Sequence, residues 1–133
     1  MRTALLLCAV VLSIGGCDAN DEIVPVPDVM LVHLVPQGLR LVTESYSYCE
    51  QPIYIGTRAE PGVLYVEVIG AERIVGAQCR AALAASATVS IPETPLDVRI
   101  RHRGRTDRYR ITSGAAGHEL VAVETSTTRL GPR

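Results

Sequence analysis

The sequence contains no phenylalanine, no tryptophan and no lysine, and asparagine occurs once, at Asn20. All thirteen basic side chains are therefore arginine, which indicates a coding bias rather than a particular need for guanidinium chemistry. With a formal net charge of −1 and a hydrophobic fraction of 47%, the 133-residue chain is neither a disordered acidic tail nor a polybasic nucleic-acid arm. Its length suits one globular domain with its own core.

Because phenylalanine and tryptophan are absent, tyrosine is the bulky aromatic residue available to the core. Tyr46, Tyr48, Tyr54 and Tyr65 cluster in the middle third of the chain. Tyrosine also serves at interfaces, since its ring is apolar and its hydroxyl is polar. We expect these four side chains in the core or at its edge, with contact to a partner or ligand as the alternative.

The N-terminus has the pattern of a secretory signal peptide. Arg2 precedes an apolar run of eleven residues from Ala4 to Ile14, and the chain becomes polar directly after Cys17. A helix needs roughly 20 apolar residues to cross a bilayer. The run therefore predicts a cleaved signal rather than a retained transmembrane helix.

At the end of this run, Ile14-Gly15-Gly16-Cys17 resembles the lipobox of bacterial lipoproteins, whose commonest form has leucine where Ile14 stands. The resemblance implies that residues 1–16 are removed and that the Cys17 sulfur carries lipid, with acyl chains such as palmitate holding the protein on the membrane. It also implies a location facing the periplasm or the cell exterior. Asp18 resembles the signal for retention at the inner membrane, which is slightly preferred over the outer membrane. The alternative is an ordinary secretory signal that leaves Cys17 as a free thiol.

Residues 17–28 are expected to form the lipidated N-terminus and a tether, followed by a β domain over residues 29–133. Pro25 and Pro27 favour extended backbone and exclude helix in this stretch. About ten extended residues reach on the order of 33 Å. Such a tether would lift the domain clear of the lipid headgroups.

Cys49 and Cys79 remain once Cys8 leaves with the signal peptide and Cys17 takes lipid. In an exported protein a residual pair predicts a disulfide, which stabilises the fold by roughly 3.5 kcal/mol for a loop of about thirty residues. Two independent buried thiols are one alternative. Redox or metal chemistry is another, although Cys-x-x-Cys spacing and further nearby ligands are missing.

Short apolar runs separated by turn residues predict a mainly β fold, a small antiparallel β-sandwich or a barrel-like domain. No window of a dozen residues shows a clean helical period. One short helix is expected at Cys79 to Ala85, where the composition favours helix. The predicted strands are Val29 to Val35, Leu39 to Tyr48, Pro52 to Thr57, Val63 to Ile69, Ala87 to Ile91, Asp97 to Arg103, Arg108 to Ser113 and Glu119 to Thr125.

A hairpin from Asp97 to Thr112 is the clearest unit. A two-residue turn at Gly104-Arg105 would pair Ile100 with Tyr109 and Val98 with Ile111, and a four-residue loop keeps the same faces. The apolar side chains then share one face with His102, which could oppose Asp107 and form a local hydrogen bond. The opposite face carries Arg99, Arg101, Arg103, Arg108 and Arg110.

This arginine face is the candidate binding site. From Arg99 to Arg110 there are six arginines against one aspartate, whereas Asp18 to Glu67 holds eight acids against two arginines. The face could contact anionic lipid, an envelope polyanion or an acidic protein, whereas nucleic acid is not expected because no aromatic residues are interleaved for stacking. The alternative is a solvated face whose arginines pair with acids such as Glu67, Glu72 or Glu124.

The sequence contains no group of residues typical of catalysis, metal binding or cofactor binding. We therefore expect that the protein is not an enzyme and that it binds no cofactor. His118 begins a His-Glu-Leu-Val-Ala run that lacks the second histidine of a zinc-protease helix, because Ala122 stands there. His33 lies in an apolar run, and Gly114 and Gly117 mark a turn rather than a phosphate loop. The catalytic and metal assignments are therefore none.

Together these features predict a lipid-anchored envelope protein of bacteria with a binding or structural role. The alternative function is an inhibitor of a cationic hydrolase such as lysozyme, using the acidic first half. Lipid-anchored lysozyme inhibitors combine a lipobox with a small β domain, and Tyr48-Cys49 resembles them faintly. Their Ser-Gly-x-x-Tyr loop is absent, because Gly117 ends the stretch that begins at Ser113.

Overall fold

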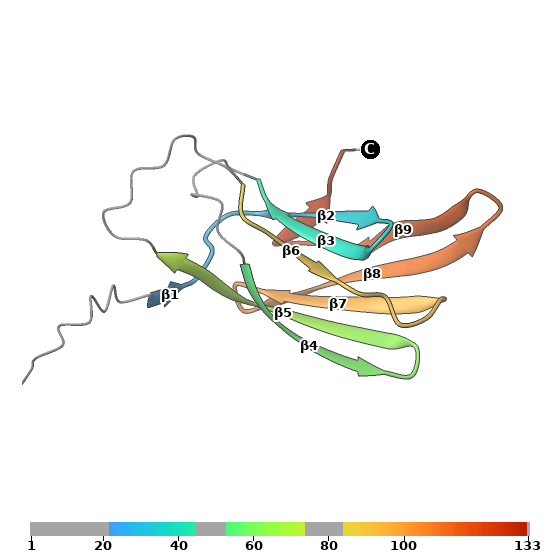
Figure 1. The fold of residues 1–133 in the computed structure, drawn as a ribbon, viewed down its shortest axis with the longest axis horizontal. Helices are drawn as coiled ribbons and strands as arrows, with labels where there is room; N and C mark the ends of the chain where they lie inside the picture. The colour runs from blue at the N-terminus through green and yellow to red at the C-terminus, as the bar shows by residue number, and fades with distance from the viewer. Residues whose placement is uncertain (1–21, 45–52, 74–83, 133) are drawn as a thin grey trace, which may run out of the picture.

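The computed structural model describes residues 22–44, 53–73 and 84–132, which form ten β-strands (Figure 1). None of these residues belongs to a helix that is long and apolar enough to span a membrane. The strands are β1 (Glu22–Val24), β2 (Met30–Val35), β3 (Gly38–Thr43), β4 (Ile53–Glu60), β5 (Val63–Arg73), β6 (Ser86–Val89), β7 (Leu96–His102), β8 (Arg105–Gly114), β9 (Gly117–Glu124) and β10 (Thr128–Leu130).

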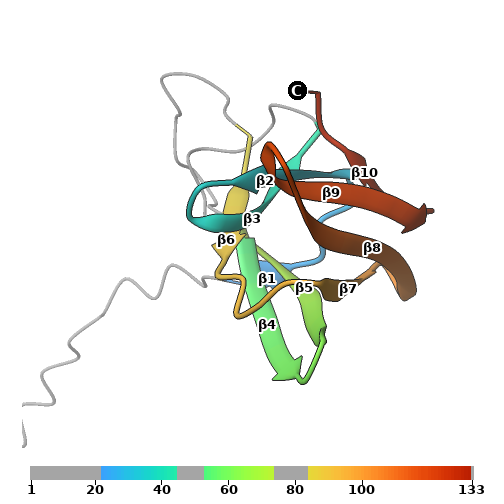
Figure 2. The same cartoon turned by 90° about the vertical axis from the view of Figure 1, so that its right-hand side faces the viewer.

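The strands form two sheets that pack face to face, which confirms the predicted mainly β sandwich (Figures 1 and 2). The first sheet has six strands, in the order β1-β5-β7-β8-β9, with β4 also pairing with β5. The second has four strands in the order β10-β2-β3-β6. Most neighbours are antiparallel as predicted, but β5 pairs with β7 and β10 pairs with β2 in parallel.

The core lies between the sheets and is built from aliphatic side chains with one aromatic. Tyr109 is the largest fully buried side chain. Because burial of a large apolar side chain contributes about 1.5–3 kcal/mol, this layer is the main source of stability. The other core residues of the strands include Met30, Val32, Leu39, Leu41, Leu64, Val66, Leu96, Val98, Ile100 and Ile111.

The domain begins earlier in the chain than predicted. Residues Glu22–Val24, expected in the tether, pair with Ala71–Arg73 at the end of β5. Val26 is buried, and the Asp28 carbonyl accepts a hydrogen bond from His102 Nε2 at 2.8 Å. The prolines of this stretch are compatible with extended backbone that packs on the domain, so Glu22–Val24 and Val26 belong to the domain rather than to a tether.

The β7–β8 hairpin turns one residue earlier than predicted. Its loop is Arg103 and Gly104, both with positive φ (52° and 74°), as in a type I′ turn. Val98 therefore pairs with Tyr109, and the predicted pairings are wrong by two residues. A shift of two residues preserves the faces, so the apolar residues are buried and the arginines point outward as predicted.

Several predictions concern residues outside the described ranges. These are the signal peptide with Cys17, the pairing of Cys49 with Cys79, the positions of Tyr46 and Tyr48, and most of the predicted helix at Cys79 to Ala85.

Candidate binding face

The outer face of the six-stranded sheet carries four of the five predicted arginines in rows that run across the strands, whereas the fifth, Arg103, lies in the β7–β8 turn. The central row crosses β4, β5, β7, β8 and β9 at one level of the sheet. A second row lies nearer the β4–β5 turn, and a third lies nearer β1. The central row is Arg58, Tyr65, Arg99, Arg108 and Glu124, the second is Glu60, Val63, Asp97, Arg110 and Val121, and the third is Gly56, Glu67, Arg101 and Thr106.

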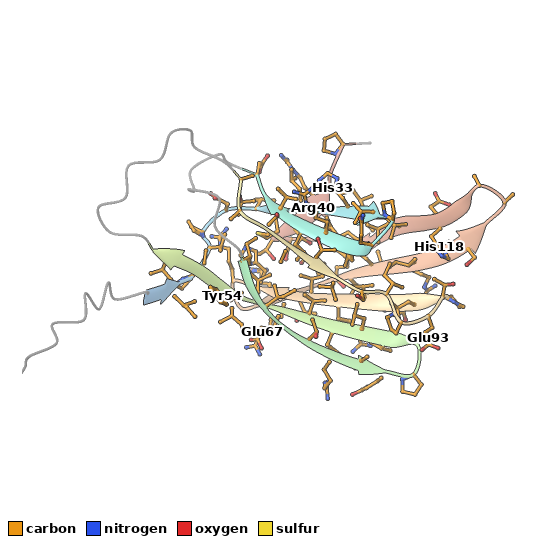
Figure 3. The ribbon with its side chains drawn as sticks, viewed as in Figure 1. His33, Arg40, Tyr54, Glu67, Glu93 and His118 are labelled. Carbon is orange, nitrogen blue, oxygen red and sulfur yellow. The ribbon has the colours of Figure 1, made fainter. Side chains whose placement is uncertain are left out.

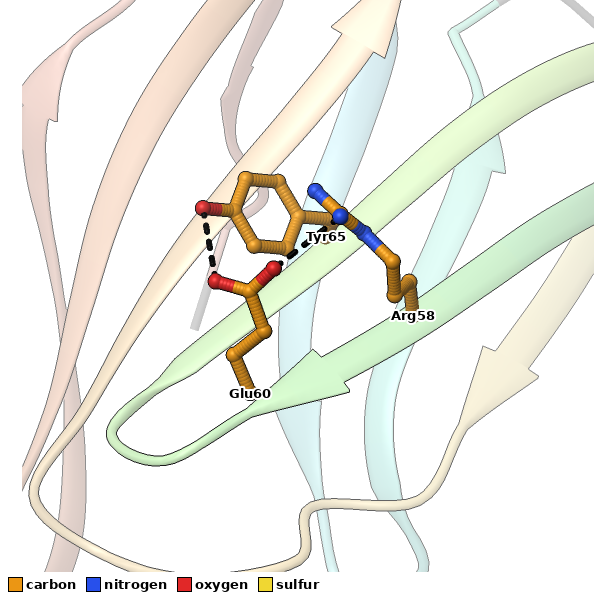
Figure 4. Close-up of polar contacts among 3 residues, drawn as sticks. All are labelled: Arg58, Glu60 and Tyr65. Atoms are coloured by element: carbon orange, nitrogen blue, oxygen red, sulfur yellow. Dashed lines mark hydrogen bonds and ion pairs between the residues drawn. The ribbon is translucent and has the colours of Figure 1, made fainter.

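Tyr65 is the aromatic centre of this face. The Arg58 guanidinium carbon lies 4.3 Å from the centroid of its ring, and that of Arg99 lies 5.5 Å away. Glu60 binds both neighbours, because its carboxylate accepts a hydrogen bond from the Tyr65 hydroxyl (3.3 Å) and lies 3.0 Å from Arg58 Nη1 (Figure 4). Tyr65 is half-buried on the outer face of the sheet and is not one of the core residues, whereas it was expected in the core or at its edge.

Arg99 and Arg108 are directly opposite each other on β7 and β8. Among the described residues, no carboxylate oxygen lies within 4 Å of either guanidinium, although Glu124 is the neighbour of Arg108 in the register. The Arg99 Nε atom is buried and has no hydrogen-bond partner there. Like charges directly across a pair of strands are destabilising, and within the described residues neither guanidinium has an ion-pair partner that offsets this repulsion.

The remaining arginines of the two strands differ in their surroundings. Arg110 Nε donates to Asp97 Oδ1 at 2.8 Å, and Arg101 lies 3.8 Å from Glu67. The hydrogen bond from Arg110 is the main cause that lowers the pKa of Asp97 below its usual value, and the charge of Arg108 contributes. Among the described residues, the alternative of pairing with acids therefore holds for these two arginines but not for Arg99 and Arg108.

The start of β8 is held by a buried carboxylate. Asp107 Oδ1 accepts hydrogen bonds from Ser126 N (2.9 Å) and Oγ (2.7 Å), and Oδ2 accepts from Thr127 N (2.9 Å), Thr128 N (2.6 Å) and Thr128 Oγ1 (2.7 Å). These donors outweigh the opposing effect of burial and lower the pKa of Asp107 to about 2. The predicted contact of Asp107 with His102 is wrong, because the register places Ile100 opposite Asp107.

Tyr109 adds to this buried cluster. Its hydroxyl lies 2.6 Å from Thr128 Oγ1, and burial raises the pKa of Tyr109 to about 12, with the Asp107 charge contributing. This hydrogen bond joins β8 to the first residue of β10, so the start of β10 is tied to the hairpin that carries the arginines. We call Asp107 with Ser126, Thr127 and Thr128 the carboxylate clasp.

The histidines do not converge. Figure 3 shows His33 and His118 on different elements, and His118 Nδ1 lies 3.3 Å from Ser113 Oγ on the neighbouring strand. A cavity of about 480 Å³ lies beside His118, lined also by the β2–β3 turn and by Glu93. Within the described ranges no three His, Cys, Asp or Glu side chains are grouped as metal ligands.

The protein is a small two-sheet β-sandwich whose outer face is rich in arginine and also carries carboxylates. No protein-family model, no curated protein and no solved structure matches the chain. Arg58 and Tyr65 were not predicted as part of the face. Their pairing could have been derived from a two-residue turn at Pro61-Gly62, which places positions 58 and 65 opposite each other.

We expect Arg108→Gln to stabilise the domain, because it removes the repulsion from Arg99. The free energy of unfolding, measured by urea denaturation at low salt, should rise by about 0.5 kcal/mol. Arg110→Gln should lower it, because Asp97 loses its ion pair. The gain at position 108 should shrink in high salt, and equal losses in both variants would contradict the repulsion.

Proposed function

We propose that the mature chain is a lipid-anchored binding protein of the bacterial envelope, and that the central row recognises an anionic partner. The observation that carries the binding role is the opposed pair Arg99 and Arg108, which lacks a carboxylate within 4 Å among the described residues. A bound carboxylate or phosphate would bridge the two guanidinium groups and remove their repulsion. Tyr65 adds a flat apolar surface beside them.

The geometry of the row suits an extended anionic partner, such as an envelope polyanion or an acidic protein segment. Arg58, Arg99 and Arg108 occupy three of the four strand positions from β4 to β8, with Tyr65 between the first two. Neighbouring strands in a sheet are about 4.8 Å apart, so the cationic groups span roughly 14 Å. A chain of anionic groups laid across the strands could contact all three.

Binding to poly-L-glutamate and to polyphosphate, measured by titration at low salt, tests this role. We expect Arg99→Gln/Arg108→Gln to weaken binding at least about tenfold, because two charge-assisted contacts are lost. The control Arg40→Gln/Arg129→Gln removes the same charge from the other sheet, and Figure 3 shows Arg40 on the side of the molecule away from Glu67. Equal weakening in both double variants would leave only a net-charge effect and refute the site.

The anchor is supported by the lipobox-like sequence Ile14-Gly15-Gly16-Cys17 at the end of the apolar run. Intact-mass analysis of the mature protein tests it directly. We expect a first residue at Cys17 and a mass increase from acyl chains. A different first residue, or an unmodified thiol at Cys17, would refute the anchor.

The lysozyme-inhibitor alternative stays a prediction without support from the described surface. It needs an acidic patch, but three acids of the first half each lie beside an arginine. Glu60 contacts Arg58, Glu67 lies near Arg101, and Glu44 is ion-paired with Arg129. A lysozyme titration without measurable affinity would dismiss it.

A further inference from the structure

One end of the sandwich lies where the lipid anchor would enter. β1 begins at Glu22, so only four residues separate it from Cys17. Five residue steps span at most about 17 Å. This is half the reach expected of the longer tether, and a domain on so short a connection has to stay close to the headgroups.

The same end contains the β7–β8 turn. β4 pairs with one side of β5. The other side of β5 pairs with β7 along Val63 to Glu67 and with β1 along Ala71 to Arg73. β1 therefore follows the point where β7 ends, and the Arg103-Gly104 turn lies beside it. Figure 1 shows the β7–β8 turn and β1 at one end, and the β8–β9 turn at the opposite end. We call the end with β1 and the β7–β8 turn the anchor end.

Two large apolar side chains are exposed at the anchor end. Ile23 on β1 is 45% exposed, and Ile69 on β5 is 52% exposed. Ile69 occupies an extra position in β5, because the register with β4 shifts there, and it lies near Gly56 on the outer face. Ile23 packs against Gly70, directly after Ile69. The two side chains thus flank one glycine on a surface next to the proposed anchor.

Cationic side chains accompany this apolar pair. Arg103 and Arg105 are exposed at the β7–β8 turn, and no carboxylate lies within 4 Å of them among the described residues. Two contacts hold the strands next to the turn, the partly buried hydrogen bond from His102 to the Asp28 carbonyl and the buried carboxylate clasp of Asp107. The two arginines are therefore presented on a rigid support.

We infer that the anchor end docks on the surface of the membrane that holds the lipid, with Arg103 and Arg105 binding anionic headgroups and Ile23 and Ile69 entering the interfacial layer. This inference rests on the lipid anchor of the proposed function. The short connection limits the distance between the domain and the membrane. The arginines supply attraction to anionic lipid, and the isoleucines supply apolar contact. In this orientation the strands rise from the membrane, and the central row with Arg99 and Arg108 faces sideways toward its partner.

The absence of tryptophan allows a direct test, because one introduced tryptophan is a unique fluorophore. The probe is Ile69→Trp in the lipidated mature protein, reconstituted in phosphatidylglycerol–phosphatidylcholine vesicles that carry brominated acyl chains. We expect a blue-shifted emission that the bromines quench. Ala116→Trp, exposed in the turn between β8 and β9 at the far end, should show neither change.

The charge requirement is tested in the Ile69→Trp background. Arg103→Gln/Arg105→Gln should reduce the docking equilibrium about 25-fold, from about fivefold for each arginine near an anionic surface. Quenching should then fall toward the Ala116→Trp level. The control Arg40→Gln/Arg110→Gln removes the same charge away from the anchor end and should keep the quenching. In vesicles of phosphatidylcholine alone, the Ile69→Trp protein that keeps Arg103 and Arg105 should also show weak quenching.

Flotation of the same samples separates the two proposals. Protein that floats with the vesicles but shows no quenching in the Ile69→Trp variant would overturn docking and leave the anchor intact. Protein that does not float would refute the anchor and the docking that depends on it. Quenching that is unchanged in Arg103→Gln/Arg105→Gln would overturn the role of the arginines.

Discussion

Asp107→Ala should lower the free energy of unfolding by about 4 kcal/mol, the largest effect we expect from a single substitution in the described residues. The variant removes the acceptor for the three consecutive amides of Ser126, Thr127 and Thr128 and for the hydroxyls of Ser126 and Thr128. Asp107 itself is fully buried, so water cannot replace the carboxylate without opening the site. Urea denaturation followed by circular dichroism measures the loss.

Asp97→Ala is the matched control, because it removes an aspartate from the partner strand of the same hairpin. Asp97 is partly exposed and pairs with a single arginine. We expect Asp97→Ala to lower the free energy of unfolding several-fold less than Asp107→Ala does. Similar losses in the two variants would mean that the carboxylate clasp stabilises the fold no more than a surface ion pair does.

The Asp107 carboxylate should also make the stability of the fold depend on pH in the acid range. Asp107 has a pKa of about 2 in the folded protein, against 3.8 as its ordinary value. The lowered value means that the ionised form stabilises the fold. This contribution, about 2 kcal/mol, is fully present above about pH 4 and is lost as the pH falls from about 4 to about 2. Urea midpoints measured from near-neutral pH down to this acid range should follow this course.

Asp107→Asn isolates that contribution from the other acids of the chain. Asparagine is similar in shape and does not titrate, and its amide hydrogens would face the donors of Thr127 and Thr128. The variant should be less stable near neutral pH, and the difference from the wild-type protein should shrink by about 2 kcal/mol as the pH approaches about 2. A difference that stays constant over this range would show that Asp107 keeps an ordinary pKa.

The clasp also bears on the proposed surfaces. It secures the first residues of β8, and the arginines of both the central row and the β7–β8 turn extend from that hairpin. A rigid hairpin keeps Arg99 and Arg108 opposite each other in spite of their repulsion. Loss of the clasp is therefore expected to weaken anion binding as well as stability.

Much of the strand pattern could be predicted from local sequence. Alternation in Asp97 to Arg103 and in Arg108 to Ser113 identifies both strands and their two faces, because side chains along a strand point to opposite sides in turn. β1 and β10 were not predicted, since three residues are too few to show alternation. The turn was placed one residue late because arginine at a positive φ carries no sequence signal.

The candidate site was predictable only in part. The sequence identifies Arg99, Arg101, Arg108 and Arg110 as one outward face, since that follows from local periodicity, whereas Arg103, predicted with them, lies in the turn. It does not indicate which of them are neutralised. That depends on the parallel pairing of β5 with β7, which places Tyr65 beside Arg99 and Glu67 beside Arg101, although these partners are far apart along the chain.

Local sequence was thus enough for the class of fold, the two faces of each main strand and the lipobox-like resemblance at Cys17, because each depends on neighbours within a few residues. Long-range pairing decided the rest. It joined Glu22–Val24 to the domain, buried Asp107 among the donors of residues 126–128, and left Arg99 and Arg108 opposite each other with no carboxylate within 4 Å among the described residues. These outcomes depend on which strands meet, and the same alternation of side chains is compatible with many pairings.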